Sequence, residues 1–307
     1  MKVFGLFLVY IVLIYQSHAF WSTGHMIISR IAFDELKSKN STLLSVIESE
    51  IDILKKFSNE NNHSFVEAAI WADDNKEIQF NQFTQWHYSN NPVVDPDFSG
   101  DIPIENMNVT WAINEMTKTL SNSNLPSMDS GLAISFSWRY LLHLVGDLHQ
   151  PLHASTLFSN QFPDGDEGGN SFEIRFDPLF PDITNLHSLW DACVGQYGSI
   201  YAPLSEQEWA TIGDIALNIT STYPRERVQE RLAITDVNVW ADESYRLARD
   251  IVYDSIQPGD TVSQEYIQRG QAAVNEQLAV AGYRLADKMQ KLVGHPHRQS
   301  VVESLLA

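Results

Sequence analysis

The segment at residues 130–153, SGLAISFSWRYLLHLVGDLHQPLH, constrains the fold most, because it predicts a long apolar helix with ionisable groups inside it. Its apolar residues recur at helical spacing after Asp129, and Pro151 should end or kink the helix. His143 and Asp147 are four residues apart and therefore share one face. A buried carboxylate such as that of Asp147 needs a binding partner. The helix face that carries the pair should therefore also contact the group that the carboxylate binds.

Helical periodicity extends over most of the chain. We expect helices near residues 23–37, 42–57, 64–74, 106–120, 130–149, 185–196, 205–217, 236–255 and 262–291. Strand signals are few, and only NSFEIRF, which follows Gly168 and Gly169, alternates well enough to predict one arm of a short β-hairpin. Residues 89–103 and 159–170 have the composition of loops. The expected fold class is mainly α, a single-domain helical bundle with a short β-hairpin and long surface loops.

The first 19 residues have the features of a secretory signal. The apolar run at residues 3–15 is shorter than the roughly 20 residues of a membrane span, which is the alternative interpretation. Ser17 and Ala19 are small residues at the positions that signal cleavage requires, so the mature chain should begin at Phe20. Four N-x-S/T triplets agree with passage through the secretory pathway, at Asn40, Asn62, Asn108 and Asn218. The expected destination is extracellular, lysosomal or vacuolar.

Composition limits the remaining possibilities for residues 20–307. Without a low-complexity linker or an internal repeat, one domain is expected, with about the last 15 residues as a loose tail. Cys193 is the only cysteine, so no intrachain disulfide can form. A formal net charge of -19 argues against a broad basic surface for polyanions. A phosphate ligand would need local cations, and we expect a monomer without a stable protein partner.

A second apolar helix repeats the spacing of the first. In NLHSLWD, His187 and Asp191 are again four residues apart, and His153 follows just beyond Pro151. Other segments supply further donors, namely His25, Asp73 and His87. A single such pair is more often an ordinary hydrogen bond, but two pairs in apolar helices favour metal ions. Imidazole and carboxylate are the ligands expected for zinc where thiolates are absent.

These motifs together resemble those of a known enzyme family. In order along the chain they are GHM, IWADD, WHY, LLHLVGDLHQPLH, EGGN and NLHSLWD, with a weaker GYRLAD near residues 282–287. The sequence is similar to the zinc-dependent, single-strand-preferring nucleases and 3'-nucleotidases of fungi, plants and protozoa, the S1/P1 type. That fold is related to the fold of zinc phospholipase C.

The resemblance implies three zinc ions. The side chains that would hold the first are Asp73, His87, His143 and Asp147. The second would share Asp147 and take His25 with the amino group and carbonyl oxygen of the first mature residue. In the family that residue, commonly tryptophan, lies five positions before the histidine, which here selects Phe20. The third would be held by His153, His187 and Asp191, with open positions for water and substrate.

The resemblance also implies roles in catalysis and substrate binding. Asp73 would orient the attacking water, and Lys76 would stabilise transition-state charge, although a surface lysine is the alternative. Tyr88 would stack on a base or else belong to the core, and Asn90 replaces a common aspartate. Asn170 would lie near the substrate, or would only close a turn.

The implied activity is that of a zinc-dependent endonuclease and 3'-nucleotidase. A zinc-activated hydroxide would attack phosphorus in line, yielding 5'-nucleotides from single-stranded DNA or RNA and removing 3'-phosphates from nucleotides. Two alternatives remain open at this point. One is a trinuclear-zinc enzyme of the phospholipase C type, and the other is a secreted zinc-binding protein without catalytic activity.

Overall fold

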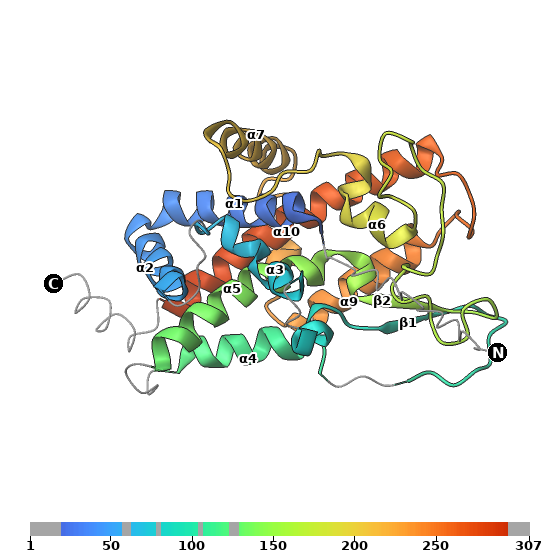
Figure 1. Cartoon of the computed structure of the whole chain (residues 1–307), viewed down its shortest axis with the longest axis horizontal. Helices are drawn as coiled ribbons and strands as arrows, with labels where there is room; N and C mark the ends of the chain where they lie inside the picture. Colours follow the sequence, from blue (N-terminus) through green and yellow to red (C-terminus); the bar gives the residue numbers. More distant parts are fainter. Residues whose placement is uncertain (1–19, 57–62, 78–80, 104–106, 123–128, 294–307) are drawn as a thin grey trace, which may run out of the picture.

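The computed structural model describes residues 20–56, 63–77, 81–103, 107–122 and 129–293 (Figure 1). The predicted signal, Asn62 and the predicted tail from residue 294 lie outside the described residues. Within the described parts the chain is mainly helical, which confirms the expected fold class. None of the helices described is long and apolar enough to cross a membrane.

The long helices form the body of the molecule in successive layers (Figure 1). Helix α7 (Glu206–Thr222) covers α1 (Ser22–Lys39), and α1 packs along α10 (Gln264–Val293). Helix α5 (Asp129–His149) contacts α1 and α10 and also packs against α4 (Val109–Ser121). Helix α2 (Ser41–Ile51) also packs on α1 and α5. The predicted central helix is therefore enclosed by the others.

The C-terminal half of α5 is buried on all sides. Every residue from 137 to 156 is buried, and its apolar residues join the main core. A helix that is apolar around its whole circumference belongs inside the protein. His143 and Asp147 are therefore carried into the core, each with 0% of its side chain exposed.

Shorter elements connect these helices. They are η1 (Asp52–Lys56), η2 (Glu67–Ile70), α3 (Trp71–Glu77), η3 (Asn81–His87), η4 (Pro151–His153), α6 (Leu186–Asp191), η5 (Cys193–Gly195), α8 (Gln229–Leu232), α9 (Val237–Leu247) and η6 (Ala248–Val252). The helix expected at 64–74 is instead a 3-10 turn followed by α3. The helix expected at 185–196 ends at Asp191, because Cys193 and Val194 adopt positive φ angles of 51° and 55°. The helix expected at 236–255 changes to a π turn after Leu247.

The sheet differs from the predicted hairpin. Strand β1 (Asn91–Val94) pairs in parallel with β2 (Ser155–Phe158), with Asn91 opposite Ser155. Residues 170–176 form no named strand, and only Glu173 and Arg175 make isolated bridges, to Asn185 and Thr261. A parallel pair needs a long crossover, here supplied by α4 and α5. Local alternation could not identify partners so far apart in the chain.

Candidate metal centre

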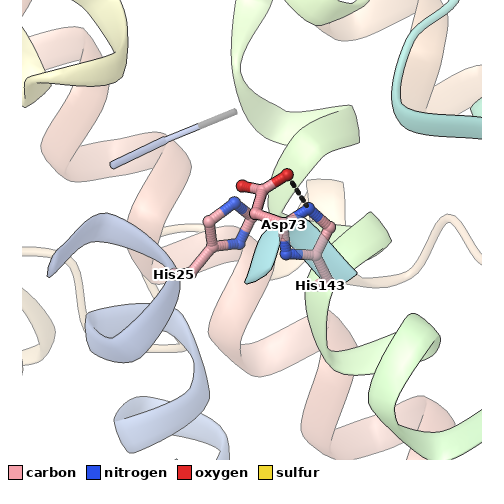
Figure 2. Close-up of side chains that lie close together, drawn as sticks. All are labelled: His25, Asp73 and His143. Carbon is pink, nitrogen blue, oxygen red and sulfur yellow. Dashed lines mark ion pairs between the residues drawn. The ribbon is translucent and has the colours of Figure 1, made fainter. Parts of the chain in front are cut away.

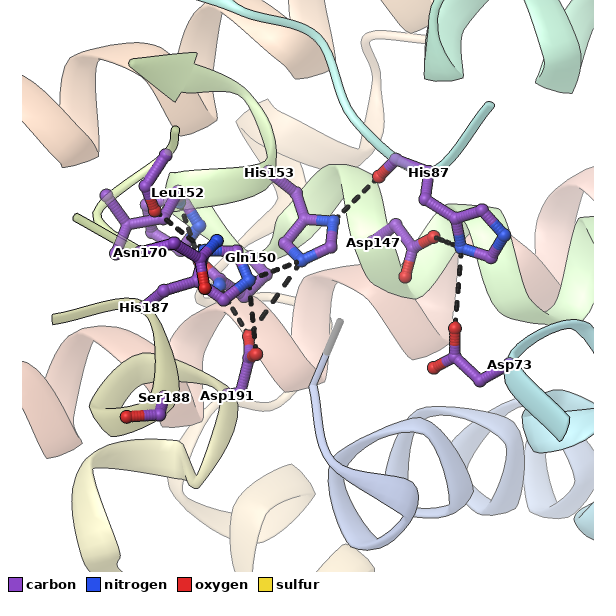
Figure 3. Close-up of polar contacts among 12 residues, drawn as sticks. Asp73, His87, Asp147, Gln150, Leu152, His153, Asn170, His187, Ser188 and Asp191 are labelled. Atoms are coloured by element: carbon purple, nitrogen blue, oxygen red, sulfur yellow. Dashed lines mark hydrogen bonds and ion pairs between the residues drawn. The ribbon is translucent and has the colours of Figure 1, made fainter. Parts of the chain in front are cut away.

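The structure brings all eight predicted side-chain ligands into three groups near the end of α5. In each group the candidate donor atoms lie within 4.8 Å of one another. Figure 2 shows one group, and Figure 3 shows most of the others. The groups are His25 with Asp73 and His143, then His87 with His143 and Asp147, and finally His153 with His187 and Asp191. Because all of these side chains are buried, the groups are built into the core.

Four donor atoms from three segments converge around the buried face of α5. His87 Nδ1 lies 3.0 Å from Asp147 Oδ2 and 3.6 Å from Asp73 Oδ1 (Figure 3). His143 Nε2 lies 3.2 Å from Asp147 Oδ2 and 3.5 Å from Asp73 Oδ1. Zinc bonds of about 2.0–2.1 Å at tetrahedral angles place neighbouring donors about 3.3 Å apart. The four separations given above lie near this value, as expected of donors that share one zinc ion.

Asp147 faces donors on both of its oxygens. Its Oδ2 lies beside His87 and His143, and its Oδ1 lies 3.3 Å from His25 Nε2. The imidazole ring of His25 stacks on that of His143 with centroids 4.0 Å apart. One carboxylate can therefore bridge two cations, as the predicted sharing of Asp147 requires.

A glycine allows His25 to approach α5. A Cβ atom at Gly146 would lie 2.7 Å from His25 Nδ1, which is too close for any larger residue. Helix α1 carries His25 and crosses α5 at this point. The glycine in HLVGD therefore serves the site through close packing rather than through chemistry.

The third group combines the turn after α5 with the short helix α6. His187 Nε2 lies 3.2 Å from both His153 Nε2 and Asp191 Oδ2 (Figure 3). A capping box between Asn185 and Ser188 fixes the start of α6 and thereby the helical spacing of His187 and Asp191. This group has three protein donors close enough to share one ion.

Backbone carbonyls select the same ring nitrogen in three of the histidines. The Nδ1 atom lies 2.6 Å from the Ala69 oxygen in His143, 2.7 Å from the His87 oxygen in His153 and 2.7 Å from the Gly168 oxygen in His187. A carbonyl oxygen can only accept, so Nδ1 carries the proton. Nε2 is then the atom available to a metal, which is the usual arrangement of a ligating histidine.

The EGGN motif contributes through its backbone. Gly168 has a φ of +63°, and a Cβ atom there would lie 2.5 Å from the carbonyl oxygen of Leu152. Only glycine can place the Gly168 carbonyl close enough to accept from His187. Buried Asp166 holds the same loop by accepting hydrogen bonds from Thr156 Oγ1 and the Tyr253 hydroxyl.

The buried polar atoms at Asp147 favour a bound cation. In the described structure neither ring nitrogen of His25 and neither carboxylate oxygen of Asp147 has a hydrogen bond of proper geometry, although all are buried. Such atoms are rare in native proteins unless an ion or water satisfies them. The donor set of imidazoles and carboxylates fits zinc, so the residues present fit the predicted metal.

Burial and neighbouring charges strongly shift the pKa values of the side chains in these groups. Burial opposes the protonation of His143, but the charges of Asp147 and Asp73 outweigh it and raise the pKa of His143 to about 10. Burial disfavours the ionised form of Asp147, yet the charge of nearby His143 holds the pKa of Asp147 well below its ordinary value. Burial and the charge of His187 lower the pKa of His153 to about 4. Without a bound metal, a proton on His143 would supply the positive charge that an ion would otherwise provide.

Phe20 lies beside the groups. Its side chain is 0% exposed, and its ring meets the ring of His25 edge-on with centroids 6.5 Å apart. A Cβ atom at Gly24 would lie 2.8 Å from Phe20 Cβ, so the glycine before His25 makes room for this packing. The predicted first residue of the mature chain therefore lies next to a predicted ligand.

The predicted substrate residues lie near the groups but are less constrained. Tyr88 and Asn90 are partly exposed and directly follow His87. The Asn170 amide donates to the carbonyl oxygen of Glu167, as expected of a turn residue, and Figure 3 places it near His187. Lys76 lies in α3, but its side chain is outside the described part of the structure.

Sequence reasoning missed one residue in contact with a predicted ligand. The Gln150 side chain is 0% exposed, and its Nε2 donates to Asp191 Oδ1 at 2.6 Å. The only signal was a polar amide between two predicted ligands in a segment expected to be buried.

Comparisons with known proteins place the chain among nucleases of one family. The family model described as S1/P1 nuclease matches residues 20–294. Endonuclease 2 of Arabidopsis thaliana is 26% identical over 291 residues, covering 90% of this chain and 91% of the relative. Nuclease S1 of Aspergillus oryzae is 26% identical over 75% of this chain and 79% of its own length. Nuclease P1 of Penicillium citrinum is 28% identical over 60% of this chain and 66% of its own length.

Proposed function

The chain belongs to the S1/P1 nuclease family, and we propose that it is a three-zinc enzyme that cleaves single-stranded DNA and RNA and removes 3'-phosphates from nucleotides. Family membership makes it an endonuclease, a hydrolase of phosphodiester bonds. The observation that carries the zinc proposal is Asp147, a fully buried carboxylate that faces His25 on one oxygen and His87 with His143 on the other. A metal pair would satisfy all of these atoms at once.

The ligand assignment is the one that the family resemblance implies, and for the third ion it coincides with the third group. Asp73, His87, His143 and Asp147 would hold one ion. His25 and the second oxygen of Asp147 would hold another, together with the amino group and carbonyl oxygen of Phe20. His153, His187 and Asp191 would hold the third. The third group has the fewest protein donors, which leaves it open to water and to a phosphate oxygen.

The chain's own residues would orient the reacting groups. Bound zinc would supply Lewis-acid stabilisation of phosphate charge and would lower the pKa of a water molecule. Asp73 would orient that water toward phosphorus, and Lys76 would stabilise charge on the phosphate. Tyr88 would stack on an unpaired base, a contact that tolerates any base identity. Asn170 would lie beside His187 of the third group.

The wider setting of the site is also part of the proposal. With a net charge of -19, the surface outside the site would repel polyanions, and the metal ions would provide the local positive charge. We propose a protein processed after Ala19, with residues 20–307 as one monomeric domain. Secretion is proposed with either an extracellular or a lysosomal or vacuolar destination. The exposed Asn40 and Asn218 would be open to glycosylation.

One assay separates this proposal from its alternatives. Purified protein would be incubated with denatured DNA, RNA, 3'-AMP and phosphatidylcholine, and zinc would be measured on the same sample. We expect about three zinc ions per chain and hydrolysis of the nucleic acids and 3'-AMP. Lipid hydrolysis with nucleic acid untouched would support the phospholipase alternative. Full zinc with no phosphoester cleavage would support the non-catalytic one.

A further inference from the structure

Gln150 connects two predicted metal-binding segments from a fully buried position. Its Nε2 donates to Asp191 Oδ1 at 2.6 Å, and its Oε1 accepts from the backbone N–H of Leu152 at 2.6 Å (Figure 3). Because the second bond fixes the orientation of the amide group, the N–H side must face Asp191. The contact is therefore directional and is set by the turn that also carries His153.

Gln150 donates its hydrogen bond to one of the two carboxylate oxygens of Asp191, namely Oδ1. The other oxygen, Oδ2, lies 3.2 Å from His187 Nε2, whereas Oδ1 lies 3.9 Å from His153 Nε2, so Oδ2 is the oxygen closer to a histidine of the third group. We propose that Gln150 is a positioning residue that limits Asp191 to a single oxygen, Oδ2, in metal binding. The inference rests on the proposed function, since it assumes that the third group holds zinc.

The backbone that carries Gln150 is well anchored. The Ser244 hydroxyl donates to the carbonyl oxygen of Leu148 at 2.6 Å, and the Gln277 amide donates to that of His149 at 2.8 Å. These bonds satisfy carbonyl groups that the end of α5 would otherwise leave unpaired. Pro151 then restricts the conformation at Gln150. The amide of Gln150 is thus held in place before any metal binds.

Single-oxygen binding has a chemical consequence. With only His153, His187 and one oxygen of Asp191 as protein ligands, an ion in the third group would keep a position for a substrate oxygen. If both oxygens of Asp191 bound, one of those positions would be filled by the protein. Gln150 would therefore keep the site open to phosphate without touching substrate itself.

The test compares Gln150 with a buried polar residue of α5 that takes no part in anchoring it. Gln150→Met keeps side-chain length but removes the N–H donor. Ser135→Ala removes an equally buried hydroxyl, which donates to the carbonyl oxygen of Ile51, and so controls for lost stability. Both variants and the unmodified protein would be loaded with Co²⁺ alone, without nucleic acid. Their visible absorption reports coordination number, because four-coordinate Co²⁺ absorbs more strongly than higher coordination.

We expect Gln150→Met to bind three ions per chain with weaker visible absorption, while Ser135→Ala keeps the unmodified spectrum. Cleavage of denatured DNA by zinc-loaded Gln150→Met should fall by about 10–100-fold in kcat/KM. An unchanged Co²⁺ spectrum would overturn the inference while leaving the nuclease proposal intact, whereas absence of bound metal in the unmodified protein would overturn the proposed function. If Gln150→Met fails to fold, a crystal structure of the zinc-loaded unmodified protein decides, because two bound Asp191 oxygens would contradict the inference.

Discussion

The backbone N–H of Trp21 donates a hydrogen bond of 2.9 Å to the carbonyl oxygen of Asp191. Asp191 also presents its carboxylate to the third group, so one residue anchors the N-terminal segment and serves a candidate metal site. Phe20, just before this bond, packs against His25. This hydrogen bond to the end of α6 therefore helps to position the predicted N-terminus. Through it, the second and third proposed metal sites are connected.

A chain that retains one extra residue before Phe20 should lose zinc and most of its activity. The α-amino group of Phe20 would then be an amide, which is a poor metal ligand. Metal analysis would be expected to give fewer than three ions per chain. Phe20→Leu with the correct start is the control, and should keep its zinc while losing about 1 kcal/mol of stability. Full zinc and activity in the extended chain would contradict the proposed ligation.

Asp147→Asn should remove the two ions that share this carboxylate and leave the third group occupied. The amide has one oxygen and no charge, so it cannot bridge two cations beside His25, His87 and His143. We expect about one zinc ion per chain and a loss of at least 100-fold in activity, beyond the 10–100-fold typical of residues that only support a ligand. Asp34→Asn, a half-exposed carboxylate paired with Arg30, is the control and should keep all three ions. Retention of three ions in Asp147→Asn would exclude the bridging role.

Zinc binding to the metal-free protein should release at least one proton at pH 7. The charges of Asp147 and Asp73 overcome burial and raise the pKa of His143 to about 10, so a proton must leave Nε2 before zinc binds. Zinc affinity should therefore rise with pH, by about tenfold per unit for one proton. Titration calorimetry in buffers of different ionisation enthalpy counts the protons, and a count of zero would contradict this prediction.

The raised pKa of His143 also predicts how pH changes the stability of the metal-free protein. Because the folded pKa of His143 lies above its unfolded value, its stabilisation is fully present below about pH 6.5. That stabilisation should be lost as pH rises toward 10. Denaturant unfolding in a chelator across this range would measure it. The contribution of His143 should be absent from the zinc-loaded protein, in which the ring is held neutral by the metal.

Asn108→Ala should destabilise even protein made without glycans. Its side-chain oxygen accepts from the backbone N–H of Trp111 and caps the start of α4, and loss of such a cap costs about 1 kcal/mol. Asn218→Ala is the matched sequon variant, because Asn218 is exposed within α7 and alanine favours a helix. Thermal unfolding of both variants tests the difference, and equal stability would exclude the cap as the cause.

Glycosylation at Asn108 has a further structural constraint. Asn108 and Thr110 line a pocket of about 390 Å³, together with Ser89, Asn238 and Tyr245. The Asn108 amide nitrogen already donates to the Ser89 hydroxyl. A glycan on Asn108 would therefore begin within this pocket, whereas glycans on Asn40 or Asn218 would extend from exposed surface.

The helical framework could be predicted because it depends on local periodicity. The central helix was expected at 130–149, and α5 spans Asp129–His149. The helix before Cys193 was predicted too long, because nothing local signals that Cys193 and Val194 adopt positive φ angles. The predicted hairpin was wrong for a related reason. Strand β1 pairs with β2, which lies beyond two intervening helices, and no local pattern encodes that pairing.

The sequence by itself determined which residue types are available to the site and how they are spaced along each helix. His143 with Asp147 and His187 with Asp191 share a helical face because four residues make about one turn. Only the tertiary structure decided that these faces meet, that Asp147 divides its oxygens between two groups, and that Gln150 takes one oxygen of Asp191. The reason is physical. Helical spacing is a property of neighbouring residues, whereas ligand geometry depends on how α1, α5 and α6 pack, with glycines such as Gly146 allowing contact that no single segment specifies.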